Sequence, residues 1–162
     1  MANATTLILG IGNNLLSDEG VGIHVVNALE SGHPELPGVT CLDGGTLSFT
    51  LADSVASNNR LIVVDAARTG SVPGTVSCFE GEEMDRYLTG NRQSVHEVGL
   101  SDLLDIARLT ESYPEKWALI GIEPQNIDWG EQPSEPVSHA IPEAVAQILA
   151  LLKKWDAPPD LS

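Results

Sequence analysis

The chain has 162 residues, of which 42% are hydrophobic and 19% are charged. This length and balance predict one folded domain with a substantial core and exclude a disordered chain. The formal net charge is −15, because 23 Asp and Glu residues outnumber eight Lys and Arg residues, so nucleic acids and anionic membranes are excluded as partners.

Short apolar runs typical of buried strands alternate with segments of helical periodicity. The runs are Thr6 to Leu9, Val39 to Leu42, Leu61 to Val64, Thr75 to Phe79 and Trp117 to Ile122. The helical stripes are Val21, Val25, Ala28 and Leu29, then Leu100, Leu103, Leu104 and Ala107, and finally Ile141, Val145, Ile148, Leu152 and Trp155. This alternation predicts an α/β fold, in which a single three-layer domain has a twisted, mostly parallel sheet with helices on both faces.

The link between the third and fourth apolar runs does not contain a helical segment. Residues 68–74 are too few for a crossover helix, so Thr75 to Phe79 is predicted to be an antiparallel edge strand. After Ile122 the chain is polar and contains three prolines, which predicts a long loop that forms one wall of a site. We expect the domain to span residues 1–157 and residues 158–162 to form a disordered tail.

The sequence shows no targeting segment, no membrane-spanning stretch and no cysteine motif. No basic segment precedes the first apolar run, and no apolar stretch is as long as a bilayer is thick, so we expect a cytoplasmic protein. The two cysteines, Cys41 and Cys78, have no C-x-x-C spacing. We interpret both as ordinary packed residues rather than as zinc ligands or disulfide partners.

The first run enters a turn that combines two conflicting signals. Gly10 and Gly12 are typical of a nucleotide-binding turn, but Asp18 and Glu19 follow where a phosphate would sit. An uncompensated carboxylate there repels a pyrophosphate by several kcal/mol, given roughly 4 kcal/mol for two charges 4 Å apart at an effective dielectric near 20. The turn therefore favours a cation over a nucleotide.

Further polar residues follow the other predicted strands, where ligands collect in open α/β sheets. They are Asp43-Gly44-Gly45-Thr46 after the second run, Asp65 after the third, and His96 just before a predicted helix. Glu19, Asp65 and His96 would offer two carboxylates and one imidazole to a borderline divalent ion such as nickel, zinc or iron, with coordination positions left open. Each also has a structural interpretation, as a helix-dipole acid, a turn acceptor and a capping or surface residue respectively.

Other catalytic signatures are absent. The segment His96-Glu97-Val98-Gly99-Leu100 has a leucine where H-E-x-x-H needs its second histidine, which excludes a zincin. The sequence contains neither a G-x-S-x-G elbow nor a G-x-x-x-x-G-K-[ST] loop.

Five motifs in order resemble those of the hydrogenase maturation endopeptidases, the proteases that trim the large subunit of nickel-iron hydrogenases. They are Gly10-Ile11-Gly12-Asn13 through Asp18-Glu19-Gly20-Val21-Gly22, Asp43-Gly44-Gly45-Thr46, Val64-Asp65-Ala66, His96-Glu97-Val98-Gly99 and Gly121-Ile122-Glu123-Pro124. The resemblance implies that Glu19, Asp65 and His96 bind the metal and that Asp43, Gly44, Gly45 and Thr46 line the substrate cleft. Leu47-Ser48-Phe49 follows Thr46, where many relatives place another glycine near Ser48.

The resemblance also implies a function. An endopeptidase of this family removes the carboxyl-terminal extension of the large-subunit precursor after nickel insertion, and the nickel arrives with the substrate. Other divalent metals are expected to substitute in the isolated protein. On this hypothesis the metal positions the scissile bond and polarises its carbonyl or a water, and Glu19 or Asp65 acts as general base.

Two other functions stay open on the sequence. A Rossmann-type nucleotide-binding module would use Gly10 and Gly12 in its turn and Asp43 on a ribose. A non-catalytic nickel chaperone or sensor would use the same three metal ligands without cleaving a substrate.

Overall fold

The computed structural model describes residues 4–13, 15–45, 50–90 and 95–156, with the side chains of residues 50 and 95–98 excepted. Within this part of the chain, five strands form one sheet in the order β2-β1-β3-β5-β4. The strands are β1 (Thr6–Ile11), β2 (Val39–Gly45), β3 (Arg60–Ala66), β4 (Val76–Glu80) and β5 (Lys116–Ile122). Neighbouring strands run parallel except β4, which pairs antiparallel with β5. The predicted mixed sheet and its antiparallel edge strand are confirmed.

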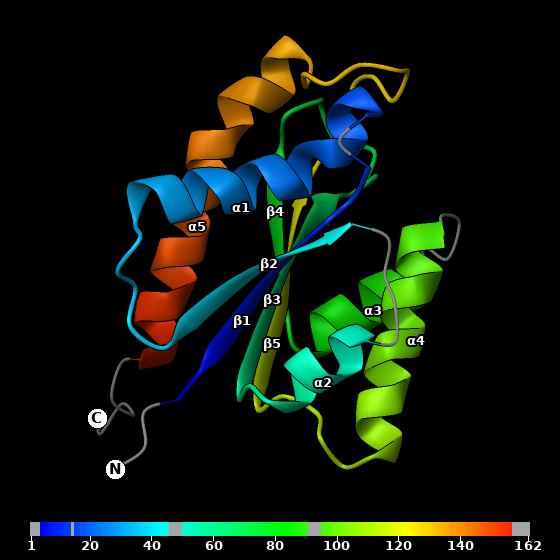
Figure 1. The fold of residues 1–162 in the computed structure, drawn as a ribbon. Helices are drawn as coiled ribbons and strands as arrows, with labels where there is room; N and C mark the ends of the chain where they lie inside the picture. The colour runs from blue at the N-terminus through cyan, green and yellow to red at the C-terminus, as the bar shows by residue number, and fades with distance from the viewer. Residues whose placement is uncertain (1–3, 14, 46–49, 91–94, 157–162) are drawn as a thin grey trace, which may run out of the picture.

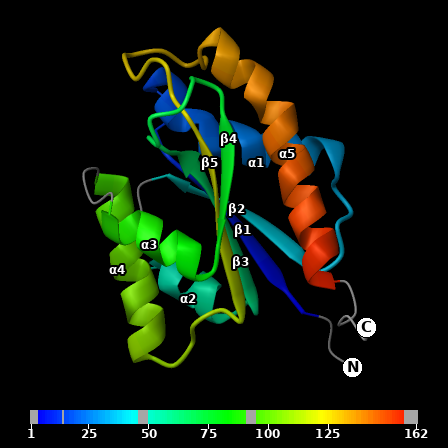
Figure 2. The same ribbon diagram turned by 180° about the vertical axis from the view of Figure 1, so that it is seen from behind.

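The helices cover both faces of the twisted sheet (Figures 1 and 2). They are the short 3₁₀ helix η1 (Ser17–Gly20), α1 (Val21–Gly32), α2 (Thr50–Ala56), α3 (Glu82–Gly90), α4 (Val95–Leu109) and α5 (Glu135–Asp156). One face carries α1 and α5, and the opposite face carries α2, α3 and α4. The three-layer α/β domain is therefore confirmed.

Strand β1 shows why the core divides into two layers. All six of its residues are buried, as expected for a central parallel strand covered on both faces. Because side chains alternate along a strand, Ile8 enters the cluster beneath α1 and α5, whereas Leu7 and Leu9 enter the cluster beneath α2, α3 and α4. Strands β3 and β5 divide their side chains in the same way.

Several helices differ from the sequence prediction. Helix α4 includes His96, which was predicted to lie just before a helix. Helices α2 and α3 were not predicted, because α2 has only seven residues and α3 has a polar sequence with three buried side chains. Helix α5 begins at Glu135 rather than near Ile141. Pro136 fits its first turn, where a backbone N–H has no helical partner. The polar loop after β5 therefore spans residues 123–134.

Residues 157–162 lie outside the described part of the chain, so the predicted tail stays a prediction. Across the described residues, none of the helices combines the length and the apolar character needed to cross a bilayer.

Candidate functional site

The turn after β1 holds Glu19 against the end of that strand. Gly12 has φ +137°, and a Cβ at this position would overlap the backbone carbonyl of Glu19. The Glu19 N–H donates to the Leu16 carbonyl at 3.0 Å and closes the turn. Only glycine combines this backbone conformation with so close an approach, so Gly12 determines where Glu19 lies.

The start of α1 packs directly on the ends of two strands. A Cβ on Gly22 would overlap the Val64 carbonyl of β3 and lie 2.6 Å from the Ile11 carbonyl of β1. A Cβ on Gly10 would lie 2.6 Å from the carbonyl of Gly22. Val64 immediately precedes Asp65, so this glycine packing brings η1 and the end of β3 to the same place on the sheet.

Asp65 and Glu19 are the two predicted ligands whose side chains the structure describes. Asp65 is 5% exposed, and its Oδ1 accepts a hydrogen bond from the Ala66 N–H at 2.8 Å. Glu19 is half-buried, and both carboxylates take part in further interactions of the fold. Since η1 contacts β3 directly, the two predicted carboxylates belong to neighbouring segments at one edge of the sheet.

His96 belongs to the first turn of α4, which begins at the end of the sheet where β1 and β3 finish (Figure 1). Its side chain is outside the described residues. Among the side chains that are described, no three His, Cys, Asp or Glu residues form a group able to hold a metal ion. A complete ligand set of Glu19, Asp65 and His96 therefore stays a prediction.

The end of β2 lies beside the turn after β1. Asp43 pairs with Gly10, and a register shift follows on β1 between Gly10 and Ile11. The exposed side chain of Asp43 accepts a hydrogen bond from the Gly45 N–H at 2.8 Å, a local turn that suits the positive φ of Gly45. Thr46, the last residue of the predicted cleft, lies outside the described residues.

This geometry disfavours the nucleotide-binding alternative. In a dinucleotide site, the glycine turn leads straight into a helix whose N-terminus receives the pyrophosphate. Here η1 stands between Gly12 and the start of α1, and it carries Asp18 and Glu19. Gly22 packs against two backbone carbonyls, so the strand ends fill the space beside the first turn of α1 where a pyrophosphate would bind.

Asp18 holds the loop after β5, a role that the sequence did not reveal. The side chain is fully buried, and its Oδ2 accepts hydrogen bonds from the Gln125 and Asn126 N–H groups, both at 2.8 Å. Ser134 donates its N–H to Oδ1 at 2.6 Å and its hydroxyl to Oδ2 at 2.7 Å. Burial alone raises the pKa of Asp18, but the hydrogen bonds outweigh it and hold the pKa below its ordinary value.

Ser17 fixes the same loop at its other side. Its hydroxyl donates to the Asp128 carbonyl at 2.7 Å, and its N–H donates to the Gly130 carbonyl at 2.7 Å. Gly130 in turn donates to the Leu15 carbonyl at 2.8 Å, which completes a parallel bridge between Leu16 and Gly130. The loop of residues 123–134 thus runs beside the turn that carries Glu19, as expected for one wall of a site.

Glu123 ties the loop after β3 to the end of β5. The residue is 8% exposed, and its Oε1 accepts hydrogen bonds from the Thr69 N–H at 2.8 Å, the Thr69 hydroxyl at 3.0 Å and the Ser71 N–H at 3.1 Å. The hydrogen bonds described for Asp18 and Glu123 therefore come only from backbone N–H groups and hydroxyls. Neutral donors leave the negative charge in place, which suits a cation better than an anion.

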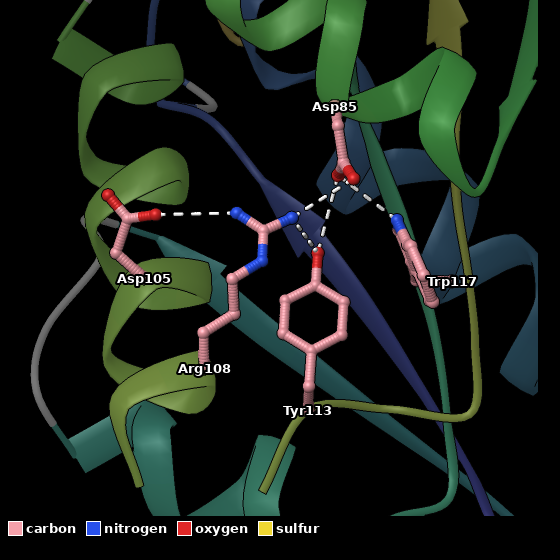
Figure 3. A network of polar contacts seen from close by, with 5 residues as sticks. All are labelled: Asp85, Asp105, Arg108, Tyr113 and Trp117. Carbon is pink, nitrogen blue, oxygen red and sulfur yellow. Dashed lines mark hydrogen bonds and ion pairs between the residues drawn. The ribbon is translucent and has the colours of Figure 1, made fainter. Parts of the chain in front are cut away.

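A second polar cluster lies away from this edge and joins α3, α4 and β5 (Figure 3). Asp85 accepts hydrogen bonds from Trp117 Nε1 at 3.1 Å, Tyr113 Oη at 3.3 Å and Arg108 Nη2 at 3.0 Å. The adjoining cavity of about 50 Å³ is too small for more than a water or two. We interpret this cluster as a structural link between the helices and the sheet.

Comparisons with known proteins agree with this fold. A family model described as hydrogenase maturation protease matches residues 23–151. The hydrogenase 2 maturation protease of Escherichia coli K12 is 36% identical over 149 residues, covering 91% of this chain and 90% of that protein. The hydrogenase expression/formation protein HupD of Rhizobium leguminosarum bv. viciae is 37% identical over 150 residues, covering 92% and 74% of the two chains.

Solved structures give the same result. The hydrogenase maturating endopeptidase HybD from E. coli superposes with a TM-score of 0.86 at 34% identity, covering 94% of both chains. The NiFe hydrogenase maturation protease HybD from Thermococcus kodakarensis gives a TM-score of 0.78 at 31% identity, covering 91% of this chain and 98% of that one. With a matching family model, relatives above 30% identity over most of its length and the same fold, this chain belongs to the hydrogenase maturation protease family.

Proposed function

We propose that this protein removes the carboxyl-terminal extension of the large-subunit precursor of a nickel-iron hydrogenase, and that it recognises the nickel already inserted in that precursor. Glu19, Asp65 and His96 would bind this substrate-borne ion. The observation that carries the proposal is the glycine packing that places the η1 segment of Glu19 against the end of β3, where Asp65 lies.

The donor set fits the proposed ion. Two carboxylate oxygens and one imidazole nitrogen suit a borderline divalent metal such as nickel, and three protein ligands leave positions for groups of the precursor. In the isolated protein, the same set would accept other divalent metals. Because the protein gains these contacts only with a loaded precursor, the ion supplies differential affinity for precursors that are ready for cleavage.

The chain's own residues have two tasks in the proposed reaction. Glu19 and Asp65 hold the scissile segment in place through the shared ion, which lowers the entropic cost of reaching the transition state. One of the two carboxylates removes a proton from the attacking water. When bound, the metal polarises the scissile carbonyl or that water.

Precursor processing tests the proposal. Asp65→Asn and His96→Ala should each lower the rate at which a nickel-loaded precursor is shortened by about 100-fold or more, because loss of even an outer-shell partner of a metal site typically costs about 10–100-fold. Matched controls are Asp53→Asn, which alters an exposed carboxylate on α2, and His33→Ala, which alters an exposed imidazole after α1; both should process at the wild-type rate.

Two outcomes would contradict the proposal. Full cleavage by both site variants would exclude the predicted ligands. Equal cleavage of loaded and nickel-free precursors by the wild-type protein would exclude recognition through the metal.

A further inference from the structure

Three large apolar side chains are exposed on the two chain segments beside the candidate site. Leu15 is 49% exposed, Ile127 is 44% exposed and Trp129 is 79% exposed. They belong to the two segments that the Leu16–Gly130 bridge joins. A tryptophan exposed to this degree beside two aliphatic side chains indicates an interaction surface, because such groups are usually buried or at an interface.

The pairing of the two segments places Leu15 beside Trp129. Both precede the bridged residues by one position in a parallel arrangement, and residues in register on parallel segments share a face. Ile127 lies two residues before Trp129, between the Asn126 carbonyl, which accepts from the Asp18 N–H, and the Asp128 carbonyl, which accepts from the Ser17 hydroxyl. We call Leu15, Ile127 and Trp129 the apolar rim.

The rim is held in shape before any partner arrives. Asp18 and Ser17 fix the backbone of residues 125–134 through hydrogen bonds of 2.6 to 3.0 Å. A preordered surface loses less conformational entropy when it binds than a loose loop does. The strained φ of +47° at Ser17 also belongs to this constrained turn.

The acidic residues near the rim indicate which kind of partner segment it would bind. The exposed acids Asp128 and Glu131 flank Trp129 along the loop, Glu19 follows Leu15 by four residues, and the whole chain carries −15. A basic segment would be attracted by these carboxylates, and an indole binds a Lys or Arg side chain through its face. The rim therefore fits an apolar residue flanked by Lys or Arg.

We propose that the apolar rim docks a segment of the hydrogenase large-subunit precursor that presents an apolar side chain next to basic residues. This inference rests on the proposed function, because the precursor is the polypeptide that must approach Glu19. The rim is continuous with that site, since Glu19 donates its N–H to the Leu16 carbonyl, one residue from Leu15. Docking at the rim would align the precursor independently of its metal.

The test measures binding and cleavage separately. Trp129→Ser and the double variant with Leu15→Ser should weaken binding of the same organism's purified precursor by about tenfold or more, as truncation of an interface anchor does. Processing should show a raised KM with kcat retained at saturation. The matched control is Leu109→Ser, because Leu109 is 84% exposed at the far end of α4; it should bind and cleave normally.

Further arms separate this inference from the proposed function. Asp65→Asn should still bind a nickel-free precursor with wild-type affinity while losing cleavage, and Asp128→Asn should reduce the salt dependence of binding. If the wild-type protein cleaves no precursor, the proposed function fails. The affinities of the wild-type protein and the Trp129 variants for the precursor would still test the docking role of the rim. Binding by the double variant within twofold of wild type would overturn the inference. So would a wild-type dimer that Trp129→Ser makes monomeric, because the rim would then serve self-association.

Discussion

Two aspartates join distant parts of this chain, and they do so with different donors. Asp18 is fully buried and accepts three backbone N–H groups and one hydroxyl from the loop of residues 125–134. Asp85 is partly exposed and accepts from three side chains, of which Arg108 is charged (Figure 3). The first fixes the path of a backbone, whereas the second fixes how two helices lie against a strand.

The difference has a chemical consequence at the candidate site. An arginine beside Asp18 would satisfy the same carboxylate but would repel an incoming cation. Backbone N–H groups hold the loop just as firmly and carry no net charge. The described donors to Asp18 thus fix the loop beside Glu19 without adding positive charge, while the Asp85 cluster, remote from the site, can use Arg108.

The largest expected effect comes from Asp18→Asn, which keeps the size of the side chain but turns part of it into a donor. Facing four donors, the amide cannot accept every hydrogen bond, so we expect the free energy of unfolding to fall by about 3 kcal/mol. Urea denaturation measures this loss. Ser134→Ala, which removes only the hydroxyl donor, should cost about 1 kcal/mol. A loss below about 0.5 kcal/mol for Asp18→Asn would show that the hydrogen bonds to Asp18 contribute little to stability.

A smaller effect is expected for Asp85→Asn. The ion pair with Arg108 is about half exposed on the arginine side, and Arg108 keeps a second contact with Asp105 at 3.5 Å. Partly exposed pairs contribute little, so we expect a loss of about 1 kcal/mol that shrinks in high salt. Precursor processing should remain at the wild-type rate. If Asp85→Asn lowered processing more than Asp18→Asn, the assignment of the two clusters would have to be reversed.

The smallest effect concerns the reactivity of the two cysteines and not the free energy of unfolding. Burial, with a further contribution from Glu30, raises the pKa of the half-buried Cys41 thiol to about 11. Only the thiolate reacts with iodoacetamide, so the alkylation rate of Cys41 should rise about tenfold per pH unit up to about pH 11. Mass spectrometry should show that the exposed Cys78 is modified first. The Cys41→Ser and Cys78→Ser variants each leave one thiol and so assign each alkylation rate to one cysteine. Equal rates at pH 7 would mean that Cys41 is more accessible than the structure indicates.

The strands were predictable because of how they are buried. A parallel strand covered on both faces appears as a continuous apolar run, and Leu61 to Val64 lies wholly within β3. Helix α3 was missed because it packs only Met84, Tyr87 and Leu88 into the core, which is too short a pattern to indicate a helix.

The candidate site was predictable only in part. Strand ends indicated where Glu19 and Asp65 would lie, and both occur at the same edge of the sheet. The role of Asp18 was not predictable, because its partners are mostly backbone N–H groups, which every residue except proline carries. Nothing in the side chains of Gln125 or Asn126 marks them as donors to an aspartate more than one hundred positions away.

The outer position of β2 in the sheet has a consequence for how copies of this protein meet. Within the described chain, β2 pairs on one side only, with β1. An open strand edge can template pairing with another molecule, and charge is a common protection against such aggregation. With Asp43 on β2 and a formal net charge of −15, charge repulsion opposes the pairing of these edges between two molecules.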